Sequence, residues 1–184
     1  MAPELYTLIA FLVITIAYII HRVLVGGRDY RKFFGKMVVK CPETHETVAV
    51  KVASGRAALA SIVGREHVQL SNCTRWPEKA DCDQACLNEL KADPASHKTW
   101  TIASKWYVGK NCFYCGRPIS ELSHLDHSPA VVGPDGKIIE WDTVPAEKLQ
   151  ETLASARPVC WNCNVVESFW KEHPDLVVER PWQH

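Results

Sequence analysis

The sequence predicts an α+β protein in which a single N-terminal transmembrane helix precedes a small, cysteine-rich soluble portion. Three observations support this fold class. Residues 5–20 contain no charged side chain and are mostly aliphatic. Eight cysteines occur among 184 residues, and four of them form two C-x-x-C pairs in the second half of the chain. Between these features, β-rich runs alternate with helical patterns, as in a mixed fold.

The charge balance argues against a large nucleic-acid interface. Lys and Arg together number 21, as do Asp and Glu, so the formal net charge is zero. The first 25 residues contain one residue of each sign, Glu4 and Arg22, which leaves 20 of each in the remainder. Nucleic-acid binding requires clustered positive charge. We therefore expect the partners to be a lipid bilayer and other proteins of a membrane complex.

Residues 1–28 are predicted to form the membrane anchor and its basic flank. The apolar run begins at Leu5 and extends to Val25, with Arg22 near its end. A helix of this length rises about 31 Å, which matches the ~30 Å hydrocarbon core of a bilayer. A cleaved signal peptide is the alternative. No basic residue precedes the run and no clear small-x-small site follows it, so the anchor is favoured.

Flanking charge predicts the orientation of this helix. The residues after the apolar run are strongly basic and include Arg28, Arg31, Lys32 and Lys36, against Asp29. Positively charged flanks remain in the cytoplasm, so we expect the N-terminus outside and the C-terminal portion in the cytoplasm. A reducing compartment disfavours four disulfides among the eight cysteines, and metal ligation is the better expectation.

Residues 29–98 are predicted to form a first cysteine-containing α+β module, whose residues 93–97 act as a linker. β-rich runs, a Pro-Glu-Thr-His turn and a possible N-cap at Asp81 define its elements. In order, we expect strands at residues 37–40 and 47–52, a helix at 54–63, a strand at 67–70 and a helix at 81–92.

Four cysteines of this module are candidates for a second tetrahedral metal site: Cys41, Cys73, Cys82 and Cys86. The predicted helix would place Cys82 and Cys86, at i and i+4, on one face. The spacing matches no standard zinc pattern and neither ferredoxin pattern, so buried free thiols are the alternative. His45 could replace one thiol, although a histidine in a turn is usually a solvated side chain.

Residues 99–184 are predicted to form a second module with a C-terminal tail. The alternation of Trp100, Ile102, Trp106 and Val108 indicates a strand. The sequence Gly-Pro-Asp-Gly marks a hairpin, and Pro145 suits the first turn of a helix. We expect a strand at 99–108, a hairpin of residues 130–132 and 137–141, and helices at 145–154 and 165–172.

The two C-x-x-C pairs, Cys112/Cys115 and Cys160/Cys163, are the predicted ligands of one zinc ion. Each pair forms a tight turn that directs two thiolates at one point, and two such turns build a tetrahedral four-sulfur site. The order of turn, hairpin, turn and helix is that of a treble-clef or zinc-ribbon-like fold. We expect one zinc here, and a second if the first cysteine group also binds metal.

Residues 112–173 resemble the treble-clef zinc finger of HNH endonucleases. Those domains often read C-x-x-C-G, then Asp-His, then a hairpin with Gly, then C-x-x-C-N at the start of a helix. Here Gly116, Asp126, His127, Gly136 and Asn164 accompany the four cysteines in that order. The resemblance implies His127 as the general base that activates water, with Asp126 as its orienting or metal-binding partner. It also implies a second metal that holds the phosphate.

The chain departs from the family at two places. No Asn lies between His127 and Cys160, where the family carries one, and the helix after Cys163 is hydrophobic and acidic instead of basic. We therefore expect no catalytic residues. The C-x-x-C pairs also resemble those of rubredoxin, which implies iron and electron transfer as an alternative. The function expected is that of a membrane-anchored cytoplasmic zinc-binding accessory or scaffold subunit of a membrane complex.

Overall fold

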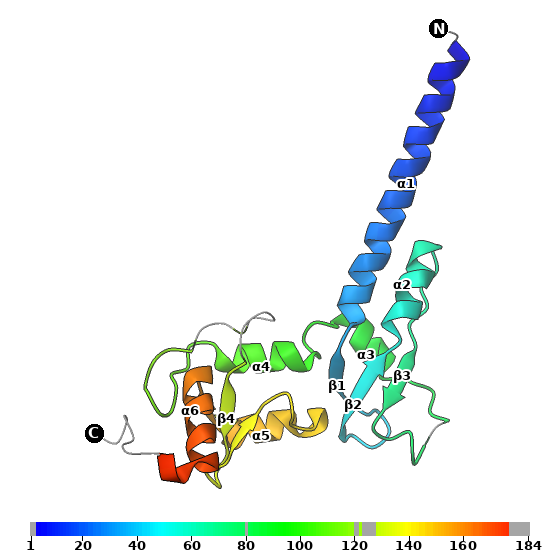
Figure 1. Ribbon diagram of the computed structural model, residues 1–184. Coiled ribbons are helices and arrows are strands. Elements are labelled where there is room, and N and C mark those ends of the chain that lie inside the picture. Colours follow the sequence, from blue (N-terminus) through cyan, green and yellow to red (C-terminus); the bar gives the residue numbers. More distant parts are fainter. Residues whose placement is uncertain (1–2, 80, 120–121, 123–127, 177–184) are drawn as a thin grey trace.

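The computed structural model describes residues 3–79, 81–119, 122 and 128–176. A long N-terminal helix extends away from two small groups of strands and helices that lie next to each other (Figure 1). The described chain thus combines helices and sheets with a long apolar N-terminal helix. This agrees with the α+β class predicted from the sequence.

The N-terminal helix α1 (Pro3–Phe33) is long and apolar enough to span a membrane. Its most apolar 18-residue stretch has a mean hydropathy of 2.4, and none of this stretch is buried inside the protein. The helix continues beyond the predicted anchor. Its last turns pack against α2 (Ser54–Ile62), which runs beside α1 with its C-terminal end directed toward the start of the chain (Figure 1).

Two side chains of α1 hold α2 in place. The Arg22 guanidinium donates through Nε to the carbonyl oxygen of Ile62 at 2.7 Å and through Nη2 to the carbonyl of Ser61. The Ser61 hydroxyl donates to the Asp29 carboxylate. Arg22 thereby satisfies carbonyls that the last turn of α2 leaves without helical partners. The helices are close at Gly26, where a Cβ would lie 2.6 Å from Ile62.

The first sheet follows α1 directly and has three antiparallel strands in the order β1-β2-β3. Its buried face packs against α1, α2 and the helix α3, and the core is rich in valine. The strands β1 and β2 agree with the predicted hairpin. The bounds are β1 (Lys36–Lys40), β2 (Thr47–Val52), β3 (Leu70–Cys73) and α3 (Leu87–Ala92).

The second sheet is also three-stranded, with the order β5-β4-β6, and helices surround it (Figure 1). The predicted hairpin is present: β4 pairs antiparallel with β5, and Gly136 takes the positive φ of 74° that the turn requires. The bounds are α4 (Thr99–Tyr107), β4 (Ala130–Val132), β5 (Ile138–Glu140), η1 (Ala146–Lys148), α5 (Leu149–Ser155), β6 (Arg157–Val159), α6 (Trp161–Glu172) and η2 (Pro174–Leu176).

The prediction of a strand at residues 99–108 is wrong, because this segment forms the helix α4. The alternating aromatic residues suggested a period of two, but Ala103 and Tyr107 are the buried residues of the segment and lie four apart. Trp100 packs against them, and Val108 is exposed. A helical face of small and aromatic residues therefore determined the conformation, and the alternation was coincidental.

Two predictions in the first module are also corrected. The strand expected at 67–70 begins at Leu70 instead, as β3. The helix expected from Asp81 begins only at Leu87, so Cys82 and Cys86 do not share a helical face. Gln84 explains this start. It has a positive φ of 57°, which interrupts a helix, and its side-chain oxygen accepts a hydrogen bond from the N–H of Leu70 at 3.0 Å.

The segment predicted as a linker, residues 93–97, makes close contacts with β1. The N–H of Val38 donates to the carbonyl of His97 at 2.8 Å, and His97 Nδ1 lies 2.9 Å from the carbonyl oxygen of Val38. The second half of the chain also contacts the first sheet through η1. The division into two modules at about residue 98 remains a prediction, and the two parts contact each other through η1 and the first sheet.

Candidate metal centre

Four cysteine sulfurs converge at one end of the second sheet. The Sγ atoms of Cys112, Cys115, Cys160 and Cys163 all lie within 4.8 Å of one another. Among the described residues, no other group of three or more His, Cys, Asp or Glu side chains brings its ligand atoms this close together. Cys112 and Cys163 are buried, and Cys115 and Cys160 are half-buried. The sequence prediction that these four come together is confirmed.

The first C-x-x-C pair lies on a tight turn between α4 and the second sheet. The N–H of Cys112 donates to the carbonyl of Arg117 at 2.8 Å, and the N–H of Gly116 donates to the carbonyl of Cys112 at 2.9 Å. Gly116 has a φ of 69°, which glycine adopts without strain. This turn directs the backbone N–H groups of Tyr114 and Cys115 toward the Cys112 sulfur.

The second pair joins the sheet to a helix. Cys160 follows β6 directly and is the N-cap of α6, and Cys163 lies in the first turn of that helix. The two turns are linked: the N–H of Phe113 donates to the carbonyl of Pro158 at 2.8 Å, and the N–H of Cys160 points at the Cys112 sulfur at 3.3 Å. The Cys115 and Cys160 sulfurs are 3.8 Å apart. The strand β6, which the sequence did not predict, therefore positions the second pair.

The protein environment favours the thiolate of Cys112 and opposes those of Cys160 and Cys163. Burial raises the pKa of Cys112, but N–H groups of Cys115, Cys160 and Tyr114 outweigh this effect and the pKa falls to about 7. Burial raises the pKa of Cys163, and hydrogen bonds with the neighbouring thiols raise it further. Burial also raises the pKa of Cys160. A divalent cation at the centre would remove this opposition, because it stabilises all four thiolates together.

The donor set suits a thiolate-seeking metal such as zinc. Four sulfurs from the protein satisfy a tetrahedral ion completely, and sites of this kind support structure, whereas catalytic zinc sites keep one position open. Arg157 lies over the ring of Phe113, 3.6 Å from its centroid, and places positive charge beside the first turn. Asn164, which follows the second pair, is buried.

The nuclease-like residues cannot be placed. His127 and Asp126, the expected base and its partner, lie outside the described residues, as does His124. His173, at the C-cap of α6, packs its ring against Phe169 with 4.9 Å between centroids.

The four cysteines of the first module also lie near one another but converge less closely. Cys41, Cys73, Cys82 and Cys86 all line a single cavity at the end of the first sheet. Among the residues described, their sulfurs do not meet the 4.8 Å spacing of the four C-x-x-C cysteines. His45 is exposed in the adjoining turn.

Sequence reasoning missed the basic residue beside this cavity. Arg75 Nη1 donates to the Cys41 sulfur at 2.8 Å, and its position two residues after Cys73 was the available signal.

Searches for similar proteins found no matching protein family, no matching curated protein and no matching solved structure.

Proposed function

We propose that this protein is a membrane-anchored, cytoplasmic zinc-binding subunit that supports a membrane complex without catalysing a reaction. The four-cysteine cluster formed by Cys112, Cys115, Cys160 and Cys163 is the observation that carries the proposal. Its two turns and the helix after the second turn follow the order of a treble clef. A closed four-thiolate zinc site would fix β6, α6 and the first turn to one another and leave no position for a substrate.

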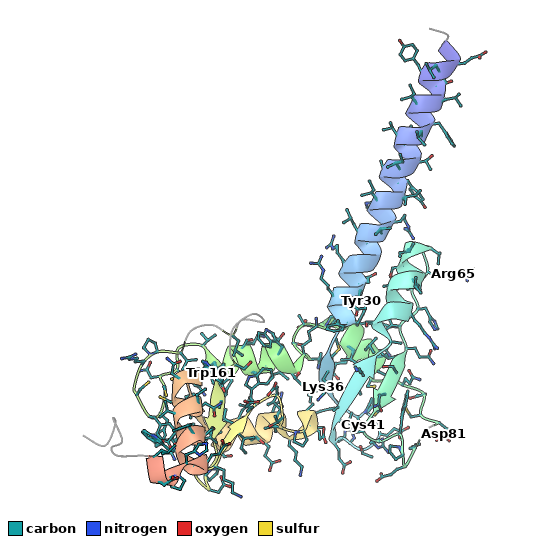
Figure 2. The ribbon with its side chains drawn as sticks, in the orientation of Figure 1. Tyr30, Lys36, Cys41, Arg65, Asp81 and Trp161 are labelled. Carbon is teal, nitrogen blue, oxygen red and sulfur yellow. The ribbon has the colours of Figure 1, made fainter. Side chains whose placement is uncertain are left out.

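The membrane role is supported by the position of the C-terminal end of α2 beside α1. Arg22 caps α2, so the tip of α2 lies beside the last part of the apolar stretch of α1. Leu59 and Val63 at this tip are 66% and 69% exposed. Arg65 follows the same tip, on the side of α2 that faces away from α1 in the view of Figure 2. Exposed apolar side chains next to arginines are typical of a surface that meets lipid headgroups.

The protein-binding role is supported by the outer face of α6. Val165 and Phe169 are four residues apart and both exposed, and the exposed Leu176 follows in η2. Neutral overall charge and an apolar, partly acidic helix suit contact with protein better than contact with nucleic acid.

The test combines location with partner binding. Full-length protein expressed in its native membrane should resist alkaline extraction and should copurify with defined partner proteins. The double variant Val165→Ser/Phe169→Ser should lose these partners while keeping its metal. Val108→Ser, which removes a still more exposed apolar side chain from another surface, should keep them. Release of the wild-type protein by alkaline extraction, or equal partner binding by all three proteins, would contradict the proposal.

A nuclease of the HNH type is the second candidate, and the order of turn, hairpin, turn and helix supports it. It predicts nicking of plasmid DNA with magnesium or manganese, lost in His127→Ala by roughly 10²–10⁴-fold, the usual contribution of a general base. Our proposal predicts no nicking by either protein. A rubredoxin-like electron carrier would instead be coloured and would contain iron as its main metal, whereas four-thiolate zinc is colourless.

A further inference from the structure

Residues 41–46 form the same turn that carries the first cysteine pair. In residues 112–117, the N–H of Cys112 donates to the carbonyl of Arg117 at 2.8 Å, and the N–H of Gly116 donates to the carbonyl of Cys112 at 2.9 Å. In residues 41–46, Cys41 N–H donates to Glu46 at 2.8 Å and His45 N–H donates to Cys41 at 2.8 Å. His45 has a positive φ of 58°, close to the 69° of Gly116.

The shared backbone has the same consequence for the sulfur. In both turns the N–H groups two and three residues after the first cysteine point at its Sγ: Tyr114 and Cys115 in one, Glu43 and Thr44 in the other. A sulfur that accepts several N–H groups is stabilised as a thiolate, which is the form that binds metal. Thr44 occupies the position of the second cysteine, so this turn offers one sulfur.

Three further sulfurs face the turn from different elements. Cys73 ends β3, Cys82 lies in the loop that follows, and Cys86 is the N-cap of α3. All three line the same cavity as Cys41, whose volume is about 30 Å³. Such a cavity holds a water-sized species. Cys41 lies at the end of the first sheet that points away from α1 (Figure 2).

Two cations, Arg75 and Lys79, lie at this cavity together with the carboxylates of Glu43 and Asp83. Arg75 donates to the Cys41 sulfur, and both Arg75 and Lys79 line the cavity and pair with Glu43, at 3.3 and 2.8 Å. A divalent ion with four thiolates carries a net charge of −2, and adjacent cations and N–H donors offset such a charge. Of the two, Arg75 contacts a sulfur directly, and this hydrogen bond favours the thiolate of Cys41.

We infer that Cys41, Cys73, Cys82 and Cys86 form a second four-thiolate site for a divalent, thiolate-seeking cation of the zinc type. Cys41 supplies the preformed corner. The other three sulfurs close on the ion. The site ties the end of the first sheet to α3, so each half of the soluble portion has its own metal. This inference does not depend on the proposed membrane role.

The test is the metal content of the purified full-length protein in detergent. Wild type should contain two zinc per chain. The double variant Cys41→Ser/Cys82→Ser should retain one, held by the other cluster, and Cys160→Ser/Cys163→Ser should also retain one. Cobalt substitution gives a second readout that is independent of yield. Wild type should show twice the tetrahedral thiolate–cobalt absorption per chain of either double variant.

His45→Gly is the matched control within the same turn. Glycine preserves the positive φ and removes the imidazole, so this variant should keep two metals if the ligands are four thiols. An equal zinc content per chain in wild type and in Cys41→Ser/Cys82→Ser would overturn the inference, because the variant would then have lost no metal. Loss of one metal in His45→Gly would overturn the assignment of the four sulfurs as ligands.

Discussion

Removal of one ligand from the four-cysteine cluster should unfold only the part of the second half that the cluster organises. The core next to the cluster contains five buried residues: Cys112, Ala130, Val132, Val159 and Cys163. Two of these belong to the four-cysteine cluster. The two valines contribute roughly 3–6 kcal/mol at about 1.5–3 kcal/mol each. Binding of zinc to a structural site contributes on the order of 10 kcal/mol, so a zinc ion bound here would be the larger stabilising factor.

In Cys163→Ala we therefore expect loss of metal and local unfolding of residues 112–117 and 157–164. The neighbouring core of α4 and α5, which contains Tyr107, Leu149 and Leu153, has no ligand among its buried residues and should persist in part. The first sheet should be unaffected. Hydrogen exchange measured by mass spectrometry on the full-length protein in detergent resolves these three regions.

Asn162→Ala is the matched control, because Asn162 is exposed between the two cysteines of α6. It should retain both metal and protection. Unchanged protection of residues 112–117 in Cys163→Ala would refute the reasoning, since the cluster would then add nothing to the fold. Uniform loss of protection across all three regions would refute the local character of the effect.

Four further predictions concern the contact between α1 and α2, the core around Tyr107 and the topology. Gly26→Leu should separate α1 from α2 and lower the free energy of unfolding by about 1–3 kcal/mol. Gly27→Leu is the control, because a Cβ at Gly27 would meet nothing within 4 Å, and it should leave the stability unchanged. Thermal melts of the two variants in detergent give the comparison. Tyr107→Phe removes the 2.8 Å hydrogen bond from the buried hydroxyl to the Ala130 carbonyl. The free energy of unfolding in denaturant should fall by about 1–3 kcal/mol, and equal stability of variant and wild type would contradict this prediction. Burial raises the pKa of Tyr107, so ionisation at strongly alkaline pH should unfold wild type at a lower pH than Tyr107→Phe. A C-terminal alkaline phosphatase fusion in a bacterial host should be inactive, and an active fusion would reverse the proposed orientation.

Local sequence signals predicted the parts of this protein that depend on neighbouring residues. The β4–β5 hairpin followed from Gly-Pro-Asp-Gly, whose second glycine takes the required positive φ. The four-cysteine cluster followed from the two C-x-x-C spacings, because each turn fixes two sulfurs by itself. What remained was to bring the turns together, and β6 does this through a three-residue pairing with β4 that is too short to recognise in a sequence.

Long-range contacts account for what the sequence did not predict. Arg22 caps α2 from a position 39 and 40 residues earlier in the chain, and no local pattern links the two. The turn at residues 41–46 was hidden because Thr44 stands at the position of the second cysteine. The helix α4 was mistaken for a strand because its aromatic residues alternate, and only the packing of Tyr107 and Ala103 into the core distinguishes the two.

The central claim is that Cys112, Cys115, Cys160 and Cys163 hold a zinc ion, and X-ray absorption at the zinc edge tests it most directly. The double variant Cys41→Ser/Cys82→Ser isolates this cluster from the other cysteine group. We expect about one zinc per chain in that variant, with a first shell of four sulfurs at about 2.3 Å. A first shell dominated by nitrogen or oxygen, less than half a zinc per chain in folded protein, or iron as the main metal would contradict the account.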